Sequence, residues 1–218
     1  MQTPFVIALD GPAASGKGTL ARLISEHYGF AHLDTGTLYR GVAWLILSDG
    51  GDPADGDVAA RAARAFDTSK IAGADIRTKE VGAAASVVAA DPAVRSALLE
   101  FQRRYAANPP NGASGAVLDG RDIGTVVCPA ATVKFFVTAG PKVRTHRRWL
   151  ELVAVRPELE EATVYNDLLE RDARDAARSD APMVAADDAE LLDTTHLSID
   201  AAFAAARRVI DGVFRRCG

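Results

Sequence analysis

The sequence has few cysteines and histidines, which leaves little material for a disulfide framework or a metal centre. Among its 218 residues there are 2 cysteines, Cys128 and Cys217, and 4 histidines. The cysteines lie far apart and match no metal-ligand spacing, and the histidines form no HxH or HxxxH pair. We therefore expect neither a disulfide framework nor a histidine-based metal site.

Long apolar runs are equally scarce, and none approaches the ~20 residues that span a lipid bilayer. The first run, residues 5–9 (FVIAL), is too short for a signal peptide and leads directly into a glycine-rich loop. The formal net charge is -4, whereas non-specific binding of nucleic acid requires a basic surface. We expect a soluble, reduced, cytoplasmic protein, by default a monomer, that binds neither membrane nor nucleic acid.

Lysine is also rare, because only 5 of the 25 basic residues are lysines and the rest are arginines. The abundance of alanine indicates that a GC-rich coding bias explains the count. Guanidinium groups nevertheless bind phosphate in a bidentate manner, so the positions of the arginines decide whether they have a role.

A near-match to a phosphate-binding loop lies close to the start of the chain. Residues 10–19 read DGPAASGKGT, against the pattern G-x-x-x-x-G-K-[ST], and Gly18 stands where the pattern has a hydroxyl. In such loops backbone N–H groups surround the anion and the lysine reaches the β- and γ-phosphates. Thr19 is the candidate ligand of Mg²⁺, directly or through water, because this ion readily keeps its own waters. The candidate nucleotide-binding residues are Gly11, Pro12, Ala13, Ala14, Ser15, Gly16, Lys17, Gly18 and Thr19.

The residues around this loop have the strand, loop and helix order that the motif requires. Residues 5–9 are apolar throughout, as in a parallel strand that is buried on both faces. Apolar residues from Leu20 to Tyr28 recur at helical spacing, and Gly29 is the expected end of that helix.

Further apolar runs at 116–118, 133–137 and 191–192 alternate with helical patterns, and the last precedes an amphipathic helix that begins near Ser198. The apolar side of that helix is expected to consist of Ile199, Phe203, Ala206, Ile210 and Phe214. This alternation predicts an α/β fold with a parallel sheet flanked by helices.

Two segments interrupt the alternation, and we interpret them as insertions in the core rather than separate domains. Residues 36–112 contain helical patterns and turn-rich stretches, and residues 141–188 are charged, helical and rich in arginine. The predicted core therefore comprises residues 1–35, 113–140 and 189–218.

Several arginines are placed where they could surround phosphate groups. Arg121 directly follows an apolar run, at the end of a strand, where ligands of open parallel sheets bind. Arg171, Asp175 and Arg178 share one helical face. Transfer of a phosphoryl group to another phosphate brings two anions together, and converging cations make that contact possible.

A second cluster consists of Arg144, Arg147 and Arg148, which also share one helical face. A solvated charged face is the more common role of such runs. We expect that role for Arg144.

Gly18 points to a subgroup of these loops, because G-x-x-x-x-G-K-G-T resembles the loop of the nucleoside monophosphate kinases. Over nearly the whole chain the sequence resembles the bacterial-type cytidylate kinases, and GRDIGTVV and ERD-x-RD are the most discriminating elements. The similar segments are LDTGTLYR at 33–40, IRTKEVGAAASVVAADPAVR at 76–95, DGRDIGTVVCPAATVKFFVTA at 119–139, HRR at 146–148 and ERDARDAARSDAP at 170–182. Residues 151–169 depart from the family pattern.

This resemblance implies transfer of the γ-phosphoryl group of ATP to CMP or dCMP, with the help of Mg²⁺. It implies that residues 36–112 bind the nucleoside monophosphate and that residues 141–188 form a lid. The implied catalytic residues are Lys17, Arg121, Arg171 and Arg178.

The resemblance also implies how the acceptor nucleotide is held. Thr35 and Arg40 would bind its phosphate, with Arg121 and Arg171 nearby, and Asp175 would bind the ribose hydroxyls.

Ser86, Arg95 and Asp122 would read the cytosine by the same resemblance, since a carboxylate accepts a hydrogen bond from the N4 amino group and a guanidinium donates to the carbonyl. From the residues alone, without the family resemblance, we would expect Asp122 to form a salt bridge with Arg121 and the Ser86 hydroxyl to lie on a helix surface.

Two other functions compete with this hypothesis. The first is a kinase for a small alcohol, with Asp34 as the base, because an alcohol must lose a proton as it attacks. The second is a nucleotide-dependent switch of the GTPase kind. Such switches need D-x-x-G after a strand and an [NT]-K-x-D guanine reader, and the sequence contains neither.

Overall fold

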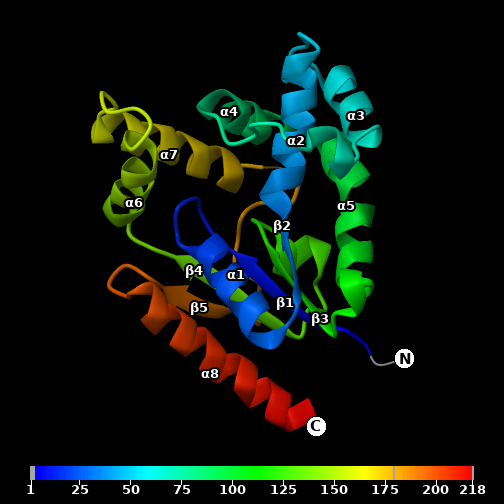
Figure 1. Ribbon diagram of the computed structural model, residues 1–218, viewed down its shortest axis with the longest axis vertical. Helices are drawn as coiled ribbons and strands as arrows, with labels where there is room; N and C mark the ends of the chain where they lie inside the picture. Colours follow the sequence, from blue (N-terminus) through cyan, green and yellow to red (C-terminus); the bar gives the residue numbers. More distant parts are fainter. Residues whose placement is uncertain (1–2, 179, 218) are drawn as a thin grey trace.

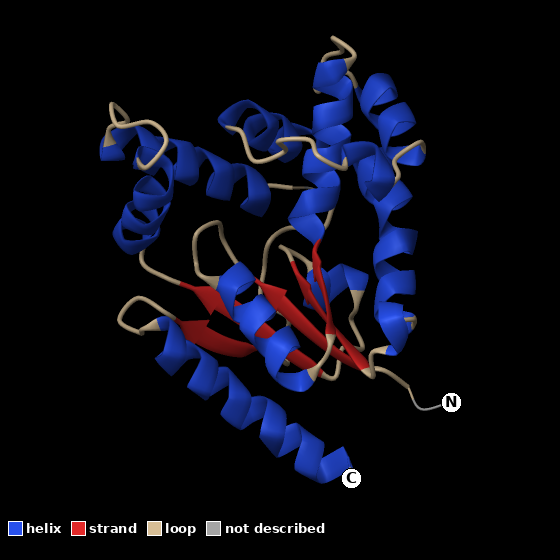
Figure 2. Ribbon diagram, in the orientation of Figure 1, coloured by secondary structure: helices blue, strands red, loops and turns tan. Residues whose placement is uncertain are grey.

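The computed structural model describes residues 3–178 and 180–217, and its centre is a parallel β-sheet (Figure 1). The strands are β1 (Phe5–Asp10), β2 (Ala31–Asp34), β3 (Gly115–Asp119), β4 (Val133–Thr138) and β5 (Glu190–Asp193). Their order across the sheet is β2-β3-β1-β4-β5, and each neighbouring pair is parallel. The prediction of an α/β fold with a parallel sheet is confirmed, and all strands end at one edge (Figure 2).

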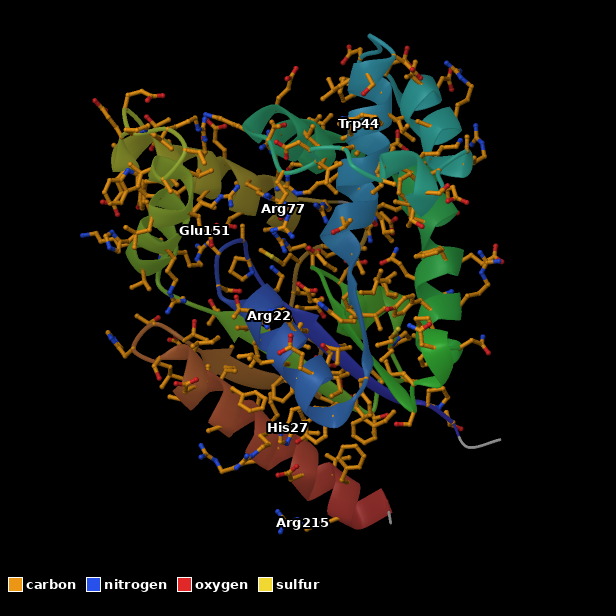
Figure 3. The ribbon with its side chains drawn as sticks, viewed as in Figure 1. Arg22, His27, Trp44, Arg77, Glu151 and Arg215 are labelled. Atoms are coloured by element: carbon orange, nitrogen blue, oxygen red, sulfur yellow. The ribbon has the colours of Figure 1, made fainter. Side chains whose placement is uncertain are left out.

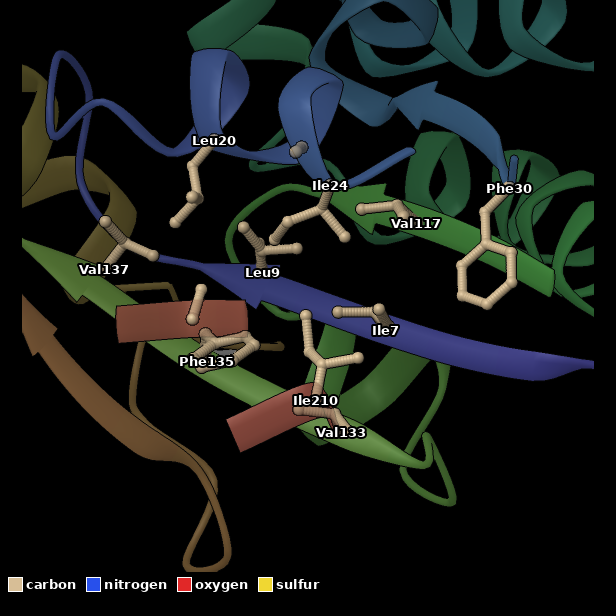
Figure 4. Close-up of a cluster of buried hydrophobic side chains, with 12 residues drawn as sticks. Ile7, Leu9, Leu20, Ile24, Phe30, Val117, Val133, Phe135, Val137 and Ile210 are labelled. Carbon is tan, nitrogen blue, oxygen red and sulfur yellow. The ribbon is translucent and has the colours of Figure 1, made fainter. Parts of the chain in front are cut away.

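β1 lies in the middle of the sheet, and its side chains alternate between two apolar cores. Ile7 and Leu9 face α1 (Lys17–Tyr28) and α8 (Ile199–Cys217), as Figure 4 shows. Ala8 faces the opposite core, which includes residues of β3 and of the helices beyond it. Burial on both faces explains why this strand is a continuous apolar run.

The long insertion forms a helical bundle with its own apolar core, centred on residues such as Leu38, Val42, Val88 and Leu98. Its helices are α2 (Thr35–Ser48), α3 (Gly56–Arg64), α4 (Lys79–Val88) and α5 (Pro92–Ala107), with short 3₁₀ turns η1 (Thr68–Ile71) and η2 (Pro110–Gly112). The side chains of Asp55, Thr78 and Asp91 cap the amino ends of α3, α4 and α5, as expected for these residue types.

The second insertion consists of two packed helices, α6 (Pro141–Val153) and α7 (Glu161–Ala176). In Figure 1 these helices stand on one side of the loop between β1 and α1, and the bundle of α2 to α5 stands on the other. Lys79 on α4 and Asp167 on α7 form an ion pair of 2.7 Å that joins the two sides.

Next to the site, β2 and the short π-helix η3 (Ile123–Val127) were not predicted from the sequence, and neither were the short turns η1 and η2. The predicted strands and the end of the first helix at Gly29, which has a φ of 67°, are confirmed. On the predicted apolar side of α8, Ala206 and Ile210 are fully buried, whereas Ile199, the first residue of the helix, is 42% exposed.

Among the described residues, no single helix is both long enough and apolar enough to span a bilayer. Of these residues, only the bent pair Lys79–Val88 and Pro92–Gly112, whose axes differ by 97°, reaches that length and apolarity when the two helices are taken together.

Candidate active site

The phosphate-binding loop runs from the end of β1 to the start of α1, and its backbone depends on glycine. Gly11 has a φ of 139°, and a Cβ there would lie 2.0 Å from the Val137 carbonyl oxygen. Gly16 has a φ of 90° directly before α1. The positive end of α1 and its first N–H groups therefore face the space that the loop encloses.

A cleft of about 800 Å³ opens beside this loop at the carboxyl edge of the sheet. Arg22 of α1, Arg77 before α4 and Glu151 of α6 line it and are labelled in Figure 3, so three separate parts of the chain form its walls. The cleft is also lined by the predicted residues Lys17, Thr35, Arg40, Ser86, Arg95, Arg121, Asp122, Arg171, Asp175 and Arg178. Of the loop, residues 13–19 line the cleft, whereas Gly11 and Pro12 are buried beneath it.

Lys17 lies buried at the base of the cleft, where its Nζ donates a hydrogen bond of 3.3 Å to the Pro12 carbonyl. Burial and, to a smaller extent, the nearby Arg121 lower the pKa of Lys17 from its ordinary value of 10.5 to about 7, although Asp119 opposes them. An anionic phosphate beside this nitrogen would favour its charged form. The site is therefore suited to an anion.

Asp175 of α7 lies at the centre of three arginines: Arg121, which follows β3, and Arg171 and Arg178, which lie on α7 and just after it. Its carboxylate is 2.8 Å from Nε of Arg121 and 3.9 Å from Nε of Arg171, and it accepts a hydrogen bond from Arg178. Burial alone would raise the pKa of Asp175, but the arginines outweigh burial and lower it. Three cations against one carboxylate leave an excess of positive charge at this point.

A second polar group lies at the far end of the cleft, between α4, α5 and β3. The buried side chains of Arg95 and Asp122 form an ion pair, and Arg95 also approaches the Tyr39 hydroxyl at 3.4 Å. Burial raises the pKa of Asp122, although Arg95 opposes this effect. The expectation of a salt bridge between Asp122 and Arg121 is wrong, because Arg121 turns to Asp175 instead.

Ser86 is buried on α4, and its hydroxyl has no hydrogen-bond partner in the described part of the chain. The expectation of a hydroxyl on a helix surface is therefore wrong. A buried hydroxyl that faces a cleft without a partner can bind a polar group of a ligand.

Thr35 and Arg40 lie on the first turns of α2, on the wall of the cleft next to β3. The Thr35 hydroxyl donates a 2.8 Å hydrogen bond to the Asp119 carbonyl, and Arg40 donates a 3.0 Å bond to the Ile76 carbonyl. Burial and neighbouring cations lower the pKa of Arg40. These two side chains are held toward the cleft by backbone groups.

The arginines of α6 do not form the solvated face that was expected for Arg144. Arg144 is buried, lies 2.7 Å from Asp172 of α7, and donates a 3.2 Å hydrogen bond to the Ala13 carbonyl of the loop. Arg147 donates bonds of 2.9 Å and 2.7 Å to Thr194. Only Arg148 of the three lines the cleft.

The sequence matches one family along almost its whole length. The family model for cytidylate kinase matches residues 7–211. The chain belongs to the cytidylate kinase family. The resemblance seen in the GRDIGTVV and ERD-x-RD elements is thus confirmed.

Two relatives from this family show how closely the chain follows it. A cytidylate kinase of Rhodopseudomonas palustris (strain BisB18) is 52% identical over 209 residues, which are 96% of this chain and 97% of the relative. One from Xanthobacter autotrophicus is 53% identical over 214 residues, which are 98% and 100%. A solved structure of an uncharacterized protein from Eubacterium ventriosum shares the fold, with a TM-score of 0.56 at 15% identity over 95% of this chain and 98% of that one.

Several polar residues of this cytidylate kinase family member were not singled out from the sequence. Asp119 ends β3, is buried, and lies 2.9 Å from Nε2 of His32. Asp10 ends β1 in the same way. Their position in the sequence could have identified them, since each is an aspartate directly after an apolar run.

The described residues contain no group of three or more histidine, cysteine, aspartate or glutamate side chains suited to a metal ion. Thr19 is exposed on the wall of the cleft. The Thr19 hydroxyl is the side chain on this wall that would hold Mg²⁺, directly or through a water.

Proposed function

We propose that this kinase transfers the γ-phosphoryl group of ATP to CMP or dCMP, and so produces ADP and CDP or dCDP. Membership of the cytidylate kinase family supports this reaction. The observation that carries it is the single cleft that holds a phosphate loop, an excess of arginine, and a buried polar group that matches cytosine. An oxygen of the acceptor phosphate attacks the γ-phosphorus, and the bond to the β-phosphate oxygen of ADP breaks.

The loop and Lys17 hold the donor nucleotide. Backbone N–H groups of residues 13–19, which line the cleft, bind the phosphates together with the positive end of α1. Mg²⁺, bound through the Thr19 hydroxyl or a water beside it, would neutralise part of the charge on the phosphates. Lys17 takes up or keeps its proton when the phosphates arrive, because they favour the ammonium form.

The acceptor phosphate is bound by Thr35 and Arg40, close to the sheet edge. Its ionised oxygen needs no general base, so the main task of the site is to bring two anions together. Arg121, Arg171 and Arg178 bring the two phosphates together, since cations placed where negative charge develops in the transition state lower the barrier to transfer. When the phosphates bind, these arginines contact them in addition to Asp175.

Arg95, Asp122 and Ser86 read the base. The Asp122 carboxylate accepts from the N4 amino group of cytosine, and the guanidinium of Arg95 and the hydroxyl of Ser86 donate to its ring acceptors. Uracil has a carbonyl oxygen in place of the amino group, and a carboxylate repels it. Asp175 accepts from the ribose hydroxyls.

In this proposal residues 36–112 form the acceptor-binding insertion, and residues 141–188 form a lid that excludes water from the reaction. The ion pair between Lys79 and Asp167 supports contact between these two parts. We propose a monomer as the active unit, which is supported by the fact that one chain supplies every residue named here. Free nucleotides as substrates support a location in the cytoplasm.

A coupled assay of ADP release tests the function. The protein is given ATP and Mg²⁺ with CMP, dCMP, UMP, AMP or a small alcohol in turn. We expect rapid ADP release with CMP or dCMP and much slower release with the others. Release with an alcohol but not with CMP would instead support the alcohol kinase with Asp34 as the base.

A further inference from the structure

Asp10 is a buried carboxylate that does not line the cleft, yet it contacts the segment that carries two predicted site residues. Its Oδ1 accepts a hydrogen bond of 2.6 Å from the Ile123 N–H, and its Oδ2 accepts one of 2.7 Å from the Gly124 N–H. Arg121 and Asp122 directly precede these two residues. Asp10 thus joins β1, which leads into the phosphate loop, to the segment at the opposite end of the site.

These hydrogen bonds replace a cap that the helix does not make for itself. The residue before a helix commonly accepts from its first N–H groups with its own side chain. Asp122 occupies that position before η3 but makes no such bond, because its side chain pairs with Arg95. Asp10 accepts from the first two N–H groups instead, and this leaves the Asp122 carboxylate free to face the cleft.

The packing around this contact is tight enough to fix it. A Cβ on Gly124 would lie 3.3 Å from Oδ2 of Asp10 and 3.1 Å from the Lys134 side chain. The N–H of Gly120 donates a 2.9 Å hydrogen bond to the Leu9 carbonyl, so a second bond ties the same segment to β1. Burial raises the pKa of Asp10 and the two N–H groups lower it, with a net value of about 6. The two N–H donors, one to each oxygen, favour the carboxylate form.

We propose that Asp10 is a positioning residue: it holds residues 120–124 so that Asp122 and Arg121 stand at fixed places in the cleft. The effect on base selection rests on the proposed function, in which Asp122 reads cytosine. Asp10 does not line the cleft, so its role is not that of a catalytic residue. It acts through the segment that it binds.

The substitution Asp10→Asn tests this role, because the amide keeps the shape but sets an NH₂ group against one of the two N–H donors. A misplacement of about 1 Å is enough to cost on the order of 10²-fold in a site of this kind. We expect the KM for CMP to rise about 10-fold and the CMP to UMP ratio of kcat/KM to fall about 10-fold, with the KM for ATP within about 2-fold of wild type.

Two further variants separate positioning from a loss of stability. Asp211→Asn is the matched control, since this carboxylate accepts a 2.6 Å bond from Tyr28 far from the cleft; it should leave the CMP to UMP ratio unchanged. In an Asp122→Ala background, Asp10→Asn should lower the ratio no further, because the reader through which Asp10 acts is gone.

The proposal is overturned if Asp10→Asn keeps the wild-type ratio, or if it lowers the ratio equally with and without Asp122. If Asp10→Asn does not fold, Gly124→Ala gives the same readout, because its methyl group presses on the Asp10 carboxylate while the carboxylate remains. An unchanged ratio in that variant likewise rejects the proposal. Failure of the proposed function would show separately, as a wild-type protein that releases no ADP with CMP.

Discussion

Replacement of Lys17 with methionine should abolish phosphoryl transfer and, at neutral pH, make the fold more stable. Methionine has a similar length and no charge. It therefore removes the cation that binds the phosphates, and also the free-energy cost of burying that charge. Burial, together with the cations Arg121 and Arg171, lowers the pKa of Lys17 from 10.5 to about 7. The site therefore holds a charge that destabilises the protein until a nucleotide is bound.

The size of this effect follows from the pKa difference between the folded and unfolded chain. At about 1.4 kcal/mol per pKa unit, the folded state loses on the order of 4 kcal/mol at pH 7. Methionine also loses the hydrogen bond to the Pro12 carbonyl, worth about 1 kcal/mol. We expect Lys17→Met to raise the free energy of unfolding by about 2 to 3 kcal/mol at pH 7.

The effect has a defined pH window. The unfolded chain binds more protons than the folded chain between pH 7 and 10.5, so the wild type gains stability as the pH rises through this range. The penalty is fully present below pH 7 and is lost above 10.5. The advantage of the methionine variant should therefore shrink by about 2 kcal/mol between pH 7 and pH 9.

Urea unfolding of both proteins at pH 7 and pH 9, without nucleotide, measures the difference, and the ADP-release assay with CMP measures the activity. The matched control is Lys142→Met, the same change at an exposed position on α6, which should alter neither quantity. The reasoning fails if Lys17→Met is less stable than wild type at pH 7, or if its advantage is the same at pH 9. Near-normal turnover would remove the loop from the mechanism.

Three other substitutions test separate parts of the site. Asp122→Ala should reduce the preference for CMP over UMP by about 10-fold in kcat/KM, since one base contact is worth roughly 1 to 3 kcal/mol; an unchanged ratio means that Asp122 is not the base reader. Gly11→Ala places a Cβ 2.0 Å from the Val137 carbonyl oxygen and should cost about 3 kcal/mol or more in urea unfolding; a loss below about 1 kcal/mol contradicts the close packing of the loop. Arg144→Ala leaves Asp172 without its partner and should cost about 2 to 4 kcal/mol, whereas a solvated arginine would cost almost nothing.

Much of the core could be predicted because its signals are local. The apolar runs of β1 and β4, the loop with Gly16 and Lys17, and the stop at Gly29 each follow from neighbouring residues. β2 was not predicted because it is short and contains His32, so its pattern is weak. η3 was not predicted because its amino end is capped by Asp10 of β1, a residue far away in the sequence, so no local capping signal marks its start.

The sequence by itself determined the fold class, the phosphate loop, and the set of arginines and aspartates from which the cleft is built. Only the tertiary structure decided which of these charges meet. It paired Arg95 with Asp122, Arg121 with Asp175, and buried Arg144 against the loop. The physical reason is that such pairs join residues far apart in the chain. The same arginine is stable either in water or beside a buried carboxylate. Only the packing of the helices around the sheet therefore decides which of these two environments each arginine has.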